Sequence, residues 1–187
     1  MKRIVLVFGL ISGALLSAML AVSMAFQEQI GFDRGMVVGF TTMFLAFLLV
    51  YFGIRTYRDT IGGGSVRFGR AFAIGMSIVV VATACYVATW QVIYSRFMPD
   101  FAEKYAAHVI AKARADGESE ARIAERQREM AEFQQQYRNP LVRIAYTFLE
   151  PLPMGIPMSL IGAALLSRRR REDGAEDLAR ATRPSTA

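Results

Sequence analysis

Few side chains in this sequence could carry out chemistry, and they lie far apart along the chain. The 187 residues include one histidine, His108, and one cysteine, Cys85. A catalytic histidine or a zinc site needs partners, such as a nucleophile with a carboxylate, or several thiol and imidazole ligands. Because neither residue has such partners, we expect Cys85 to be a packing residue and His108 to lie half-buried at an interface. The sequence predicts no catalytic residue, no metal site and no cofactor.

Glu150 is the candidate functional acid. It lies in the apolar stretch TFLEPLPMGIPMSL, together with three prolines. A charge at the centre of a bilayer costs about 2.5–3.5 kcal/mol on insertion scales, so an acid at that depth is usually functional. The alternative is a position at the outer interface, beside a helix that starts at Pro151. We favour the interface, because Pro151 would interrupt a longer helix and a span from Pro151 to Ser167 still covers roughly 25 Å.

The glycine-rich segment IGGGSVRFG, residues 61–69, invites comparison with phosphate-binding loops. It lacks the lysine and hydroxyl residue of the P-loop, and Arg67 occupies a glycine position of the dinucleotide-binding motif. We expect a flexible turn between two helices.

The elements that hold these residues are predicted to be membrane helices. The chain is 53% apolar and 20% charged, but no aspartate, glutamate, lysine or arginine occurs in residues 4–26, 35–54 or 71–94. Each run has about the 20 residues that a helix needs to cross the hydrocarbon. We expect an all-α polytopic protein with spans at about 4–26, 35–55, 71–94 and 151–167, forming one membrane domain of residues 1–170. The first run also resembles a signal peptide, but its length favours a retained helix.

The basic residues predict the orientation of these spans. They precede the first span, surround the loop between the second and third, and follow the fourth as four consecutive arginines, residues 168–171. All three groups fall on one side, which the positive-inside rule makes cytoplasmic. We therefore expect a multi-pass membrane protein with both termini in the cytoplasm. The net charge of +6 is explained by this topology and not by nucleic-acid binding.

A polar insert of residues 95–139 separates the third and fourth spans. Gly117 suits the end of one helix and Ser119 the N-cap of the next, which predicts a helix–turn–helix outside the cytoplasm. Two helices packed as a hairpin, or lying flat on the membrane, both fit the pattern. Residues 140–149 are predicted to form an interfacial helix with Arg143 facing lipid headgroups, and residues 171–187 a disordered cytoplasmic tail.

Small residues recur at four-residue spacing in the predicted spans. Such stripes let membrane helices approach closely, because no hydrophobic force drives helices together within lipid. Besides the lipid bilayer, we expect a second copy or another membrane protein as partner, through these stripes or the 95–139 insert. The helix-packing candidates are Gly9, Gly13, Gly35, Gly39, Ala71, Gly75, Gly155 and Ser159.

Several short motifs occur in a characteristic order: YRDTIGGGSVRFGRAF, YSRFMPDFAEKY, GES, YRNP and PMGIPMSLIGAALL. Their order and spacing, over about residues 2–170, resemble an uncharacterised family of bacterial membrane proteins, the domain of unknown function 4199. The resemblance implies four spans and an extracytoplasmic helical insert, and with it we expect the membrane to be the inner membrane of a bacterium. It implies no reaction and no functional residue, since the family has no assigned activity.

The sequence thus predicts a non-enzymatic scaffold or accessory protein of the membrane. The alternative is a component of a small-solute or ion transporter or channel that uses Glu150. An intramembrane enzyme is the third hypothesis, for which no acid–base or nucleophile–base set is visible.

Overall fold

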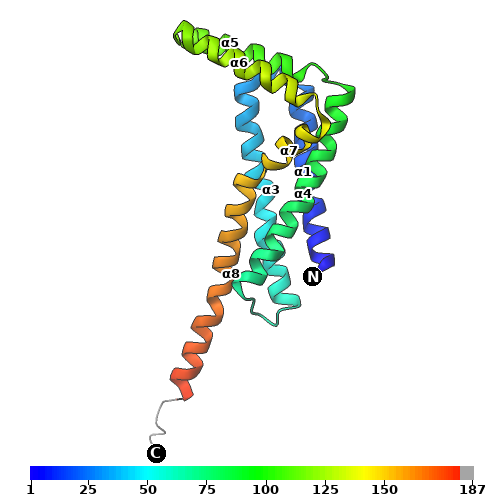
Figure 1. The fold of residues 1–187 in the computed structure, drawn as a ribbon. Coiled ribbons are helices and arrows are strands. Elements are labelled where there is room, and N and C mark those ends of the chain that lie inside the picture. Colours follow the sequence, from blue (N-terminus) through cyan, green and yellow to red (C-terminus); the bar gives the residue numbers. More distant parts are fainter. Residues whose placement is uncertain (182–187) are drawn as a thin grey trace, which may run out of the picture.

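The computed structural model describes the backbone of residues 1–181 and the side chains of residues 1–167. Within this part every regular element is a helix, and four long helices form a bundle with a pair of helices across one end (Figure 1). The helices are α1 (Lys2–Ala25), α2 (Gln27–Ile30), α3 (Phe32–Thr60), α4 (Phe68–Arg96), α5 (Phe101–Ala115), α6 (Glu120–Tyr137), α7 (Pro140–Leu149) and α8 (Leu152–Ala181).

Four segments are long and apolar enough to cross a membrane: α1, α3, α4, and α7 together with α8 as far as Ser167. The chain is therefore a membrane-embedded helical bundle, as its segregated charges predict. The fourth segment is longer than predicted, because it includes residues 140–149. Its two helices are separated at Glu150 and Pro151, where the sequence predicts an interruption.

Small residues bring the helices together at the centre of the bundle. A Cβ at Gly9 would lie 2.7 Å from Val81 Cβ, and one at Gly13 would lie 2.8 Å from Cys85 Cβ, so α1 fits closely on α4. On the other side of α4, a Cβ at Gly75 would lie 3.0 Å from Ser159 Cβ of α8. Gly155 packs on Val79 in the same way, and Ala71 is fully buried.

The other two glycines of the predicted stripes, Gly35 and Gly39, lie in the first third of α3, where none of the long helices packs closely on them. A Cβ at Gly39 would have nothing within 4 Å, and one at Gly35 would only reach Ile30. The later part of α3 is tightly packed, with Phe47, Val50 and Ile54 fully buried. The bundle is therefore closed toward the α3–α4 loop and loose toward α5 and α6.

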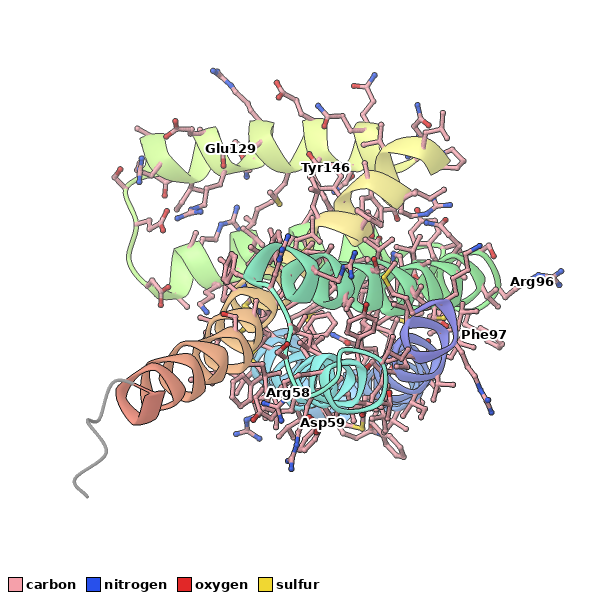
Figure 2. All side chains as sticks on the ribbon, turned by 90° about the horizontal axis from the view of Figure 1, so that it is seen from below. Arg58, Asp59, Arg96, Phe97, Glu129 and Tyr146 are labelled. Atoms are coloured by element: carbon pink, nitrogen blue, oxygen red, sulfur yellow. The ribbon has the colours of Figure 1, made fainter. Side chains whose placement is uncertain are left out.

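Helices α5 and α6 lie side by side and antiparallel across the end of the bundle (Figure 1). Gly117, at φ 72°, ends α5 in a Schellman motif, in which the Glu118 N–H donates to Ala113 O at 3.0 Å. The Ser119 hydroxyl accepts from the Arg122 N–H at 3.4 Å and caps α6. Both local predictions are confirmed. Seen along the bundle, α6 with Glu129 lies beyond the outline of the long helices, and Tyr146 of α7 lies beside it (Figure 2).

The chain returns into the bundle through Asn139 and Pro140. The Asn139 side chain accepts from the Leu141 N–H at 3.0 Å and Pro140 is the first helical residue, so this predicted cap is confirmed. Helix α8 continues through Pro157 and beyond residue 170 to Ala181. The predicted disorder of residues 171–187 remains a prediction, and residues 182–187 lie outside the described part.

Candidate functional site

The loose end of the bundle contains a cavity of about 480 Å³. Its walls come from the second half of α1, the first half of α3 and one face of α5, and α4 contributes Tyr86. Both Gly35 and Gly39 line it, which explains why none of the long helices packs closely on them. Four methionines, from α1 and α3, make much of the remaining wall: Met19, Met24, Met36 and Met43.

Glu150 and Tyr86 form the inner end of this cavity. The Tyr86 hydroxyl donates to Glu150 Oε2 at 3.1 Å, and both residues line the empty space. Tyr86 lies ten residues before Arg96, the last residue of α4, so it is roughly 15 Å inside that end of the helix. The α7–α8 junction that carries Glu150 likewise lies between the ends of the long helices (Figure 1).

The sequence places Pro151 at the start of a membrane-crossing helix, and in the structure α8 starts one residue later, at Leu152. Helix α7 packs against α4, and its C-terminal end brings Glu150 to the Tyr86 hydroxyl, where the Glu150 residue remains exposed. The expectation that Glu150 lies at the outer membrane interface, after an interfacial helix of residues 140–149, remains a prediction.

Charged residues of α3 and α5 meet at the opposite end of the cavity. Lys112 Nζ donates to Asp33 Oδ1 at 2.8 Å, and His108 Nε2 lies 3.4 Å from the same oxygen. The Phe32 ring lies 5.0 Å from the His108 ring and 5.7 Å from the Tyr105 ring, measured between centroids. The half-buried position expected for His108 is found, and its neighbours are an ion pair and aromatic rings.

Arg143 is the main residue whose surroundings the sequence did not predict. The expectation that it faces lipid headgroups is wrong, since its side chain is 7% exposed. Its Nε donates to Gln91 Oε1 at 2.8 Å, and its guanidinium lies 4.0 Å from the centroid of the Tyr94 ring. Gln91 lies in an otherwise apolar span, and it was the signal in the sequence for this contact, because a buried amide needs a polar partner from another helix.

Trp90 of α4 is buried beside the end of α6. Its ring is 5% exposed and its Nε1–H donates to the Tyr137 hydroxyl at 2.8 Å. Burial raises the pKa of the Tyr137 phenol to about 12, so this partner stays neutral at physiological pH. Together with Arg143, this hydrogen bond fastens the α6–α7 connection to α4.

The glycine-rich segment forms a turn after α3, as expected. Gly63 and Gly64 have φ values of 59° and 83°, which glycine adopts without strain, and the Gly64 N–H donates to Arg58 O. Arg58 and Asp59 lie together at this end of the bundle, joined by a 2.7 Å hydrogen bond (Figure 2).

The Glu150–Tyr86 pair has a definite chemical capacity. The Glu150 carboxylate accepts one hydrogen bond, from Tyr86, and lines the cavity. Its remaining lone pairs can therefore accept a proton or bind a cationic ligand. Among the side chains of residues 1–167, none of the ion pairs includes Glu150, and no group of three or more His, Cys, Asp or Glu residues could hold a metal ion.

Comparison with known proteins identifies a family but no activity. No curated protein and no solved structure matches the chain. The model of one family matches most of the membrane bundle and the α5–α6 pair, from residue 7 to residue 168. The chain therefore belongs to the family described as "Protein of unknown function (DUF4199)".

Proposed function

We propose that this protein is a non-enzymatic component of a small-solute or ion transport system in the bacterial inner membrane, with Glu150 as its binding acid. The observation that carries the proposal is the position of the Glu150–Tyr86 pair at the inner end of a cavity between helices. An ionisable residue inside a membrane is costly, and it commonly marks a substrate or ion pathway. The proposal thus ranks the transport hypothesis above the scaffold that the sequence favoured.

The proposed orientation places the termini and the α3–α4 loop in the cytoplasm and α5 and α6 outside. The arginines beside the first three spans and after the fourth support it, through the positive-inside rule. In this orientation the cavity faces outward, and the packed half of the bundle, around Phe47 and Ile78, closes the path to the cytoplasm. The structure then corresponds to an outward-facing binding state.

A scaffold remains the second candidate, because α5 and α6 extend beyond the bundle (Figure 1). Their outer surface is polar, with the exposed ion pair of Arg122 and Glu125 at 3.4 Å. A soluble partner or a membrane-protein partner could bind there without using the cavity.

Flux through reconstituted vesicles tests the transport proposal. The chain and its Glu150→Gln variant are reconstituted, and movement of protons, sodium ions and tetramethylammonium is followed after a concentration gradient is imposed. We expect the unaltered chain to carry at least one of these solutes faster than empty vesicles, and Glu150→Gln to lower that rate at least tenfold. Gln keeps the acceptor for Tyr86 but removes the charge.

Glu129→Gln is the matched control, since Glu129 is exposed on the outer side of α6 (Figure 2). It should leave the rate unchanged. Equal rates for the unaltered chain and Glu150→Gln, with both proteins folded, would remove the transport proposal and leave the scaffold.

A further inference from the structure

Four of the described acids line the cavity: Asp33, Asp116 and Glu118 at its α5–α6 end, and Glu150 at its inner end. Asp33 is paired with Lys112, and Glu118 accepts two hydrogen bonds from Arg126 at 2.7 and 2.8 Å. The cationic side chains among the described lining residues are His108, Lys112 and Arg126, which all come from α5 and α6. Glu150 therefore faces the space with only the Tyr86 hydroxyl bound to it, and a ligand with a positive charge would complement it.

The wall near Glu150 is unsuited to a small inorganic cation. Calcium needs six to eight oxygen ligands, and magnesium retains several waters in an octahedral shell. Apart from Glu150 itself, the inner part of the cavity offers the oxygens of Tyr86 and Thr42, and its other side chains are apolar, such as Phe40 and Met43. An inorganic ion would lose hydration there without gaining equivalent ligands.

The same wall suits an organic cation. Aromatic rings attract a cation that lies over their faces, and Phe32, Phe101 and Tyr105 line the path from the α5 side. Methionine side chains are flexible and polarisable, so the four methionines can adapt to apolar groups of different shape. The volume of about 480 Å³ lies within the range of about 300–1,000 Å³ that is typical of small-molecule sites.

We propose that this cavity binds an apolar organic cation, whose charge lies against the Glu150 carboxylate and whose apolar groups contact the methionine and aromatic walls. The inference rests on the proposed function and names its substrate class. A ligand of this kind loses little hydration on leaving water, because its charge is spread beneath apolar groups. It therefore gains from both features of the cavity.

Binding of tetraphenylphosphonium to the full chain in lipid nanodiscs tests this inference. We expect saturable binding to the unaltered chain and at least tenfold weaker binding to Glu150→Gln. Tetraphenylborate has the same shape and the opposite charge, and it should bind no better to the unaltered chain than to the variant. Glu129→Gln should bind tetraphenylphosphonium like the unaltered chain.

A second variant separates loss of the site from loss of the fold. Gly39 lines the cavity and has open space around it, so Gly39→Leu should fill part of the volume without disturbing helix packing. We expect it to elute as the unaltered chain on gel filtration and to bind tetraphenylphosphonium several-fold more weakly. The inference is overturned by equal affinity in folded Glu150→Gln, or by a bound phospholipid that tetraphenylphosphonium does not displace.

The two proposals can fail separately. Glu150-dependent flux of protons or sodium ions without binding of tetraphenylphosphonium would overturn the organic cation and keep the transport function. Glu150-dependent binding of tetraphenylphosphonium without flux of any tested solute would overturn transport and keep the ligand class.

Discussion

Arg143 joins two helices that are far apart in the sequence. Its guanidinium uses a hydrogen bond to Gln91, a contact with the Tyr94 ring and a 3.4 Å hydrogen bond to the carbonyl of Tyr137. A buried charge is costly unless it is hydrogen-bonded, and these partners together solvate it. Arg143 therefore helps to hold the start of α7 against α4, beside the hydrogen bond from Trp90 to Tyr137.

Arg143→Met tests this role at the residue scale. The change leaves the Gln91 amide without its partner, so we expect the free energy of unfolding in mixed micelles to fall by about 1–3 kcal/mol. Arg138→Gln is the control, because the Arg138 side chain is 76% exposed and lies 3.9 Å from Glu103. It should change stability by less than about 0.5 kcal/mol. Equal effects of the two substitutions would contradict the role.

The local features that were predicted correctly from the sequence are formed by residues that lie close together in the chain. The caps at Ser119 and Asn139 and the turn at Gly117 involve groups within a few residues, so local pattern is sufficient. The partners of Trp90 and Arg143 lie 47 and 52 residues away in the chain. No pattern in one sequence fixes such pairs, which is why Arg143 was expected to face lipid headgroups.

At the scale of elements, the interruption between α7 and α8 determines where the acid lies. Pro151 cannot supply the backbone donor that a continuous helix needs, and the sequence shows this directly. The direction in which α7 runs from this interruption is determined by residues far away in the sequence. It depends on the contacts of α7 with α4 and α6, so the sequence alone does not show that Glu150 meets Tyr86.

The turn between α5 and α6 should respond to acid. Two hydrogen bonds from Arg126 to Glu118 close it, and they hold the pKa of the Glu118 carboxyl below its usual value of 4.5. A lowered carboxyl pKa stabilises the folded turn above the unfolded value and loses this effect as the pH falls through the folded value. We expect amide protection at the turn to be constant near neutral pH and to fall below about pH 4.5.

Hydrogen exchange measured as protection factors checks this response. Glu118→Gln should lower the protection at neutral pH and remove most of its dependence on pH. Glu132→Gln, at another exposed acid of α6, should keep the dependence of the unaltered chain. The same pH profile in Glu118→Gln and the unaltered chain would show that another group is responsible.

At the scale of the molecule, the bundle has one closed half and one open half. Glycine contacts between α1, α4 and α8 close the half toward the α3–α4 loop, whereas the first third of α3 stands away from its neighbours. The four spans followed from length and charge, which one sequence records. The cavity could not be predicted in this way. Gly35 and Gly39 have the same four-residue spacing as Gly9 and Gly13, and the two pairs differ only in which residues lie opposite them in the structure.

Cysteine labelling tests the proposed orientation of the whole molecule. Cys85 is replaced by alanine, and single cysteines are introduced as Ser65→Cys in the α3–α4 loop and Ser119→Cys at the α5–α6 turn. In intact cells a membrane-impermeant maleimide should label position 119, and position 65 should react only after the cells are opened. Labelling of both positions from the same side would contradict four spans in this orientation.

The α5–α6 pair is tied to the bundle at two places along its length. The Asp33–Lys112 ion pair holds the end of α5 next to the Gly117 turn, and the hydrogen bond from Trp90 to Tyr137 holds the last residue of α6. One tie belongs to α3, which forms part of the cavity wall, and the other leads into α7, whose end carries Glu150. A partner bound across α5 and α6 would therefore contact a pair of helices that is joined both to the wall of the cavity and to its acid.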